Sequence, residues 1–171
     1  HPMVVANTLE KFIDDDTHVT WDGGDYCHFL RASIKRNKPF RFHNVSSFGM
    51  IGVALPYALG AQVALPESTV VLGNGDGSLG FNGMEIDTMV RHNLPVKMFI
   101  GNNSIWGIDW QIQKGLYGRP VWTDLLPTRY DIMAQGLGAY GEHVTKVEDL
   151  EAAMQRAFDY SGPALLNIDI E

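Results

Sequence analysis

A carboxylate and an amide side chain stand in this sequence at positions that could bind a metal ion together with a phosphate group. Asp76 lies within the run Gly75-Asp76-Gly77-Ser78, and Asn103 follows 27 positions after it. The backbone N–H groups of Gly77 and Ser78 and the Ser78 hydroxyl can bind an anion, but the Asp76 carboxylate would repel a bare phosphate. A cation between them removes this conflict, because carboxylate, amide, carbonyl and phosphate oxygens suit octahedral Mg²⁺. We therefore expect a Mg²⁺ ion that shares its coordination sphere with a phosphate-bearing ligand.

Either half of this pattern is common without any ligand. A Gly-Asp-Gly run is most often an ordinary turn, and Asn-Asn pairs are frequent in loops. The combination gains weight because each half follows a short apolar run, residues 68–72 before Asp76 and residues 96–100 before Asn103. Both runs are typical of buried strands. Parallel sheets bind ligands beyond the carboxyl ends of their strands, which is where both motifs would then lie.

The elements that must position these motifs follow from the alternation of apolar runs with helical segments. We predict strands over residues 18–21, 68–72, 96–100 and 164–170. We predict helices over residues 4–13, 51–65, 83–92, 107–116 and 130–137, and a last one through Tyr160 that begins with a capping box at Thr145-Lys146-Val147-Glu148. Near-continuous apolar strands between helices indicate the α/β class, with three α/β/α layers and a mainly parallel central sheet.

Length and composition exclude several classes of protein. The 171 residues suit one domain, and 45% hydrophobic residues suit a packed core rather than disorder. A formal net charge of −7, from 13 Lys and Arg against 20 Asp and Glu, makes nucleic acid an unexpected partner. No apolar run reaches the roughly 18–20 residues of a membrane helix and no signal-peptide pattern opens the chain, so we expect a cytoplasmic protein without membrane association. The single cysteine, Cys27, excludes a disulfide framework and a multi-cysteine metal site.

The metal motif also carries a family resemblance. Gly75-Asp76-Gly77 together with Asn102-Asn103 resembles the signature of thiamine-diphosphate enzymes. Further similarity to acetolactate synthases, benzaldehyde lyase and 2-hydroxyacyl-CoA lyases is carried by residues 47–64, 83–95, 102–107, 129–131 and 162–168. The chain is thus similar to the diphosphate-binding domain of such an enzyme. We expect residues 1–171 to be one domain and a fragment of a larger three-domain chain, with a separately encoded subunit as the other arrangement.

The resemblance implies a role for particular residues. Asp76, the Asn103 side chain and the backbone carbonyl of Ile105 would be the metal ligands. Gly77 and Ser78 would contact the diphosphate. Gly49 would accept a hydrogen bond from the 4′-amino group of the cofactor. The implied cofactor-binding residues are Gly24, Gly49, Met50, Ile51, Gly75, Gly77, Ser78, Asn103, Ile105 and Trp106.

Ile51 takes the position of the large apolar side chain that, in the family, supports the bend between the two cofactor rings. Its backbone N–H would face N3′ of the pyrimidine ring. The glutamate that activates the cofactor at N1′ belongs to a pyrimidine-binding domain, and this chain offers no candidate for it. Glu85 matches a structural position, so we expect no catalytic side chain here.

The resemblance implies a thiamine diphosphate- and Mg²⁺-dependent lyase or carboligase that acts on 2-keto acids or 2-hydroxyacyl compounds. A decarboxylase of 2-keto acids or of the oxalyl-CoA type, and a non-catalytic cofactor-binding domain, remain open. The implied partners are the small-molecule substrate, a pyrimidine-binding domain or subunit, and further copies of the chain in a homodimer or homotetramer.

A few other residues have both a functional and a structural interpretation. Trp106 and Trp110 would line a substrate pocket or pack in the core. His28 and His43 could reach a substrate from loops near the cofactor. Cys27 could lie near the diphosphate loop or be an ordinary buried thiol. The basic residues Lys35, Arg36 and Lys38 could contact a CoA phosphate or form a plain surface patch, and Asp14-Asp15-Asp16 is expected to be a solvated helix end.

Overall fold

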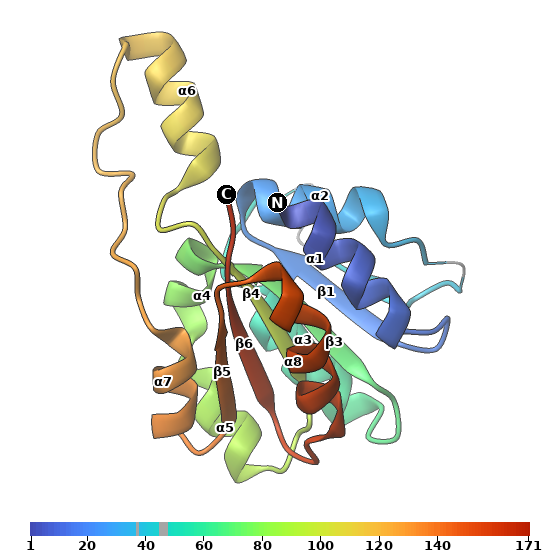
Figure 1. Ribbon diagram of the computed structural model, residues 1–171. Coiled ribbons are helices and arrows are strands. Elements are labelled where there is room, and N and C mark those ends of the chain that lie inside the picture. Colours follow the sequence, from blue (N-terminus) through green and yellow to red (C-terminus); the bar gives the residue numbers. More distant parts are fainter. Residues whose placement is uncertain (37, 45–47) are drawn as a thin grey trace.

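Six parallel strands form one sheet in the order β2-β1-β3-β4-β6-β5 (Figure 1). The computed structural model describes residues 1–36, 38–44 and 48–171, so Ser47, the first residue of one segment that carries the resemblance, lies outside the described part. All five strand pairings are parallel, which confirms the predicted α/β class and its central sheet. The strands are β1 (His18–Asp22), β2 (Phe42–His43), β3 (Val70–Gly75), β4 (Lys97–Asn102), β5 (Tyr140–Val144) and β6 (Ala164–Asp169).

Helices cover both faces of this sheet and give the expected three layers (Figure 1). One face packs against α1 (Pro2–Leu9), α2 (Gly24–Ser33) and α8 (Val147–Asp159), with the short 3-10 helix η1 (Glu10–Phe12) after α1. The other face packs against α3 (Ala54–Ala64), α4 (Asp76–Asn82), α5 (Glu85–Arg91) and α7 (Tyr130–Gly136). The remaining helix, α6 (Gly107–Tyr117), buries no residue and projects from the body in Figure 1.

The central strands are apolar on both sides because each face of the sheet packs into its own hydrophobic core. Val71, Phe99 and Leu166 belong to the core under α1, α2 and α8. Their neighbours Leu72 and Met98 belong to the core under α3, α5 and α7. This alternation along strands that are hydrophobic throughout is the pattern of a sheet covered by helices on both faces.

The two cofactor motifs come together because β1, β3 and β4 are neighbours and end at the same edge. Asp22 at the end of β1 is in register with Asn74 of β3, and Gly75 is in register with Gly101 of β4. After β1 the chain enters α2 on one face of the sheet, and after β3 it enters α4 on the other face. The loops therefore separate at this edge, which is the arrangement in which parallel sheets form a ligand-binding crevice.

Several boundaries differ from those expected from the sequence. The helix predicted to begin at Ile51 begins at Ala54, so Ile51 lies in the preceding loop. The predicted capping box at Thr145 is wrong: α8 begins at Val147 after Lys146, and no side chain of that cap donates or accepts a capping hydrogen bond. The helix predicted from Gly83 begins at Glu85 and is preceded by a separate helix, α4, that starts at the metal motif itself.

Besides α4, three further elements have no counterpart in the sequence prediction. They are α2, β2 and β5. Helix α2 begins at a glycine and buries only Tyr26, Cys27 and Leu30, too few apolar positions for a clear helical period. Strand β2 has two residues, and β5 is an edge strand that buries only Val144 fully. No helix among the described residues is both long and apolar enough to cross a membrane.

Candidate functional site

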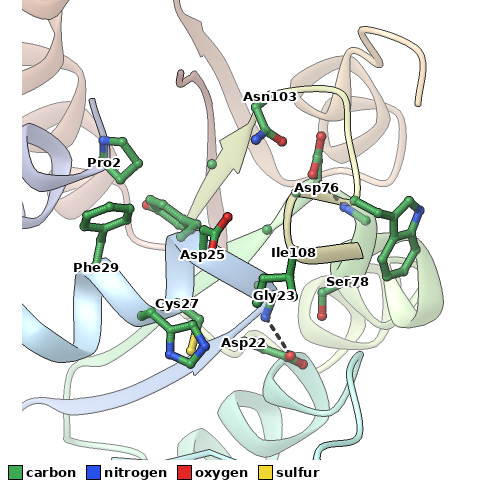
Figure 2. A pocket seen from close by; sticks show the side chains of 18 of the residues that line it. Pro2, Asp22, Gly23, Asp25, Cys27, Phe29, Asp76, Ser78, Asn103 and Ile108 are labelled. Atoms are coloured by element: carbon green, nitrogen blue, oxygen red, sulfur yellow. Dashed lines mark hydrogen bonds between the residues drawn. The ribbon is translucent and has the colours of Figure 1, made fainter. Parts of the chain in front are cut away.

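A cleft of about 540 Å³ opens at the carboxyl edge of the sheet (Figure 2). Its walls are the segments that follow β1, β3 and β4, together with residues 49 and 51 and the first turn of α6. This volume is typical of pockets that bind small molecules and cofactors.

The structure brings all but one of the sequence-predicted site residues to this cleft. Met50 does not line it and is 59% exposed. The predicted residues that do line it are Gly24, Gly49, Ile51, Gly75, Asp76, Gly77, Ser78, Asn103, Ile105 and Trp106. Their roles remain those that the resemblance implies, because the geometry shows proximity and not binding.

Asp76 is a buried carboxylate, only 4% exposed, at the start of α4. Its Oδ1 accepts a hydrogen bond from the Gly77 N–H at 2.8 Å, and its Oδ2 accepts one from the Ser104 N–H at 2.8 Å. Burial raises the pKa of this carboxyl above its usual value although the amides oppose the shift. Within the described part of the chain, no Lys or Arg forms an ion pair with it. A cation in the cleft would supply the missing partner charge.

The loop after β4 brings further oxygen atoms to the cleft beside Asp76. Oxygen ligands of this kind fit a hard cation. Figure 2 shows Asn103 and Asp76 on neighbouring segments that border the same opening. Among the described residues, the Asn103 Oδ1 has one contact, a long one of 3.4 Å with the Ile105 N–H, so this oxygen is held weakly by the protein. The described residues contain no group of three or more His, Cys, Asp or Glu that could hold a metal by themselves. A bound ion would therefore need further oxygens from its ligand, as Mg²⁺ at phosphate sites does.

Ile105 is fixed by a bridge to a distant part of the chain. It pairs in antiparallel fashion with Asp124. The Trp106 N–H donates to the Thr123 carbonyl at 2.8 Å, and the Leu125 N–H donates to the Ser104 carbonyl at 2.7 Å. Neither bond uses the Ile105 carbonyl, which is the oxygen that the resemblance assigns to the metal.

The groups expected to bind an anion already have protein partners in part. The Gly77 N–H already donates to Asp76, so in this conformation it is engaged with the carboxylate. The Ser78 Oγ accepts the Gly52 N–H at 2.9 Å, and its own hydrogen stays available as a donor. At Gly24 an added Cβ would meet only the Ile108 side chain, at 3.9 Å, so the Gly24 backbone is open to the cleft.

Asp22 is a site residue that the sequence analysis missed. It is 3% exposed and ends β1. Its Oδ1 accepts the Gly23 N–H at 2.7 Å, the bond drawn in Figure 2. Its Oδ2 accepts the Gly52 N–H at 2.7 Å and the Ala54 N–H at 3.2 Å. Since Val53, the N-cap of α3, provides no side-chain hydrogen bond, Asp22 acts as the helix cap from a neighbouring strand.

Gly52 is held from three directions behind the cleft. Asp22 and Ser78 share its N–H, and the Asn82 Nδ2 donates to its carbonyl. The residue has φ +88°, and an added Cβ would lie 2.5 Å from the Phe81 Cβ. These contacts hold the residue that directly follows residues 49–51, the segment that the resemblance assigns to the aminopyrimidine. One local signal for Asp22 was present, an acidic residue directly before two glycines at a strand end.

The remaining candidates are divided between the cleft and other surfaces. Trp106 and Trp110 both line the cleft, and the Trp106 ring lies over Gly77, where an added Cβ would be 3.1 Å from it. His28 lines the cleft from α2 rather than from a loop. The expectation for His43 is wrong, because it lies in β2 and does not line this cleft.

Neither Cys27 nor the basic patch adds a reactive group to this site. Cys27 lines the cleft, but burial raises its pKa to about 11, so it is an uncharged thiol at neutral pH. Arg36 donates to the Asp14 carbonyl, and Lys38 pairs with Asp16 at 2.7 Å. Two of the three basic residues, Arg36 and Lys38, therefore contact the acidic run that precedes β1.

Comparisons with known proteins agree with this geometry. Residues 22–168 match the family described as thiamine pyrophosphate enzyme, C-terminal TPP binding domain. The chain is 41% identical over 169 residues to a probable acetolactate synthase of Mycobacterium bovis, an alignment that covers 98% of this chain and 31% of that protein. It is 33% identical to 2-hydroxyacyl-CoA lyase 2 of Caenorhabditis elegans, with 98% and 27% covered.

A third relative is the large subunit of acetolactate synthase isozyme 2 of Escherichia coli, 34% identical, with 100% of this chain and 33% of that protein covered. The chain thus spans about a third or less of the length of these relatives. The family match covers most of the chain, including every motif at the cleft. This chain belongs to the family of C-terminal thiamine-pyrophosphate-binding domains of thiamine pyrophosphate enzymes.

Proposed function

We propose that this chain supplies the diphosphate and Mg²⁺ site of an enzyme that breaks or forms a C–C bond in 2-keto acids or 2-hydroxyacyl compounds. The observation that carries the proposal is the buried Asp76 carboxylate, which has no cationic partner among the described residues and shares its cleft with Asn103. The names of the relatives, acetolactate synthase and 2-hydroxyacyl-CoA lyase, support the reaction class.

In the proposed metal-binding half of the site, one set of groups would bind the cation and another the phosphate oxygens. Asp76, the Asn103 side chain and the Ile105 carbonyl would hold the cation, which would offset the charge of the diphosphate. The Ser78 hydroxyl and the open backbone of Gly24 are placed to donate to phosphate oxygens. When bound, thiamine diphosphate supplies a thiazolium carbon that adds to a carbonyl and accepts the electrons of the broken C–C bond.

The second half of the site orients the reactive rings. The Gly49 carbonyl would accept the 4′-amino hydrogen, and the Ile51 side chain would support the bend between the rings. Position 49 has φ +57° and an added Cβ there would meet nothing within 4 Å, so its backbone is exposed to the cleft. Asp22 and Gly52 hold this segment in place, and Trp106 covers one wall.

The proton chemistry requires a partner. We assign the activating glutamate to a pyrimidine-binding domain or subunit outside residues 1–171, in a three-domain protein that forms a homodimer or homotetramer in the cytoplasm. Glu85 begins α5 and does not line the cleft. This assignment is consistent with relatives about three times as long as the chain.

The test is calorimetry of the full-length protein with thiamine diphosphate and Mg²⁺. Asp76→Ala removes the carboxylate ligand, so we expect cofactor affinity to fall at least ~100-fold, about 2.7 kcal/mol. Asp87→Asn, an exposed carboxylate paired with Arg91, is the matched control and should bind normally. Undiminished affinity of Asp76→Ala would refute the metal site. Product analysis then separates the reactions: acyloin or acetolactate indicates carboligation, and free aldehyde indicates decarboxylation.

A further inference from the structure

Two buried asparagine side chains lie next to each other near the carboxyl ends of β4 and β6. Asn102 is the last residue of β4 and is 6% exposed, and Asn167 in β6 has no exposed surface. Asn167 is in register with Ile100 of β4, so it stands among apolar positions of the sheet. A buried amide is costly unless its polar atoms have hydrogen-bond partners. The proposed function gives neither side chain a role.

Hydrogen bonds fix which way the Asn167 amide faces. Its Nδ2 donates to the Thr128 carbonyl at 3.3 Å and to the Asp131 Oδ1 at 3.4 Å. Asp131 also accepts two hydrogen bonds from the Arg129 guanidinium, at 2.9 and 2.6 Å. Because a carbonyl and a carboxylate can only accept, the NH₂ group of Asn167 must face them. Its oxygen is thereby turned toward Asn102, whose Nδ2 donates to it at 3.1 Å.

The Asn102 amide is oriented in the same way and passes this order on to the loop after β4. Its Nδ2 donates to the Asn167 oxygen and to the Thr128 carbonyl, the latter at 3.0 Å. Its Oδ1 therefore faces Ser104, where it accepts from the N–H at 3.2 Å and from the Oγ at 3.3 Å. The same Ser104 N–H donates to the Asp76 Oδ2 at 2.8 Å. A reversed Asn102 amide would set an NH₂ group against this N–H, and both bonds to Ser104 would be lost.

Ser104 is the residue of this loop that most needs such support. Its φ of +57° lies in the left-handed region, which residues other than glycine adopt at a cost and keep only where their surroundings hold them. Asn102 holds it from one side, and the Leu125 N–H donates to its carbonyl at 2.7 Å from the other. Ser104 separates Asn103 from Ile105, so its backbone angles set the relative position of the two oxygens that this loop would give to the metal.

We propose that Asn102 and Asn167 are positioning residues that make the metal site selective for Mg²⁺ over Ca²⁺. Asn167 orients the Asn102 amide, and the Asn102 oxygen keeps Ser104 in its left-handed conformation. This inference rests on the proposed function, because it concerns the ligands of the same cation. Mg²⁺ demands a near-ideal octahedron of oxygens, whereas Ca²⁺ accepts a flexible and larger set. A loop with fixed oxygens therefore favours Mg²⁺, and a loosened loop loses affinity for Mg²⁺ before it loses affinity for Ca²⁺.

The test is calorimetric titration of the full-length protein with Mg²⁺ and, separately, with Ca²⁺, each in the presence of excess thiamine diphosphate. Asn167→Leu removes the amide and keeps a side chain of similar size. We expect Mg²⁺ affinity to fall about tenfold, and Ca²⁺ affinity to fall less than about threefold.

Gln62→Met is the matched control. Gln62 on α3 is another buried amide, 1% exposed, whose Nε2 donates to three main-chain carbonyls, and it does not line the cofactor cleft. Its replacement should lower the midpoint of urea denaturation and leave both cation affinities unchanged.

Three results would overturn the positioning role. The first is unchanged Mg²⁺ affinity in Asn167→Leu. The second is an equal loss of Mg²⁺ and Ca²⁺ affinity, which would indicate a general loosening of the fold. The third is an equal loss of Mg²⁺ affinity in Gln62→Met. If the leucine variant does not fold, Asn167→Ser, which also lacks the Oδ1 atom, is judged by the same three results.

Asp76→Ala in the same titration separates this inference from the proposed function. Unchanged Mg²⁺ affinity in Asp76→Ala would refute the metal site itself. Loss of Mg²⁺ binding in Asp76→Ala, together with parental affinities in Asn167→Leu, would refute only the positioning role.

Discussion

Replacing Asp22 by Asn tests how the aminopyrimidine segment is held. Three N–H groups, those of Gly23, Gly52 and Ala54, donate to the two Asp22 oxygens. An Asn side chain has one acceptor oxygen, so its NH₂ must face at least one N–H donor. With the oxygen toward Gly52 and Ala54, the Gly23 bond is lost.

The magnitude follows from these three bonds. A hydrogen bond to a charged acceptor contributes about 1.5–3 kcal/mol, and a neutral one about 1 kcal/mol. Loss of one charged bond and weakening of the other two gives a destabilisation of about 3 kcal/mol. The Asn oxygen still accepts the Gly52 N–H, but this bond is weaker, so Gly52, which follows residues 49–51, is held less firmly than by Asp22, Ser78 and Asn82 together. We expect thiamine diphosphate affinity to fall about tenfold or more.

Three measurements on the full-length protein check this prediction. They are urea denaturation, calorimetric cofactor binding, and hydrogen exchange of the Gly52 and Ala54 amides. The exchange measurement is the most specific, because Asp22→Asn should speed exchange at these two amides before it affects β3 or β4. Asp87→Asn, on the exposed side of α5, is the control. An Asp22→Asn protein within about 0.5 kcal/mol of the parent, with unchanged protection at Gly52, would refute the anchoring role.

Two further predictions concern stability. Gly52→Ala should cost about 2–4 kcal/mol in urea denaturation, because φ is +88° and the new Cβ would lie 2.5 Å from the Phe81 Cβ; a cost under about 1 kcal/mol would show that this contact relaxes easily. Lys97 is buried with its Nζ donating to the carbonyls of Tyr160 and Gly162, and burial lowers its pKa from 10.5 to about 8. The unfolded chain therefore binds this proton more tightly, so stability should rise between about pH 8 and pH 10.5, by at most about 1.4 kcal/mol per pH unit. Lys97→Met should remove this part of the pH dependence, and a Lys97→Met protein with the parent's slope would contradict the assignment.

The sequence predicted the part of the site that is local. Gly75-Asp76-Gly77-Ser78 and Asn102-Asn103 each follow a buried strand directly, so strand prediction alone places them at the same edge of the sheet. The role of Asp22 was missed because its partners Gly52 and Ala54 are 30 and 32 residues away. Nothing in the local pattern indicates that the loop before α3 returns to the end of β1.

Edge elements were missed for a different reason. Strand β2 has two residues, and β5 exposes part of four of its five, so neither has the apolar run that identifies β3 or β4. The pairing of Thr20 with His43 in β2 also sets the His43 ring beside that of His18. A strand of two residues has almost no signature in the sequence.

The bridge between Ile105 and Asp124 connects the proposed metal ligand to the projecting arm, which consists of α6 and the segment that follows it up to residue 125 (Figure 1). The same three residues, 104–106, carry both hydrogen bonds to the returning segment and the carbonyl assigned to the cation. An ion that orders this loop therefore also favours the paired state of residues 123–125. Thermodynamic reciprocity requires the converse: any surface that steadies the arm raises the affinity for the ion by the same factor. A second domain that binds the arm would therefore change the affinity of the cleft for the ion without touching the cleft itself.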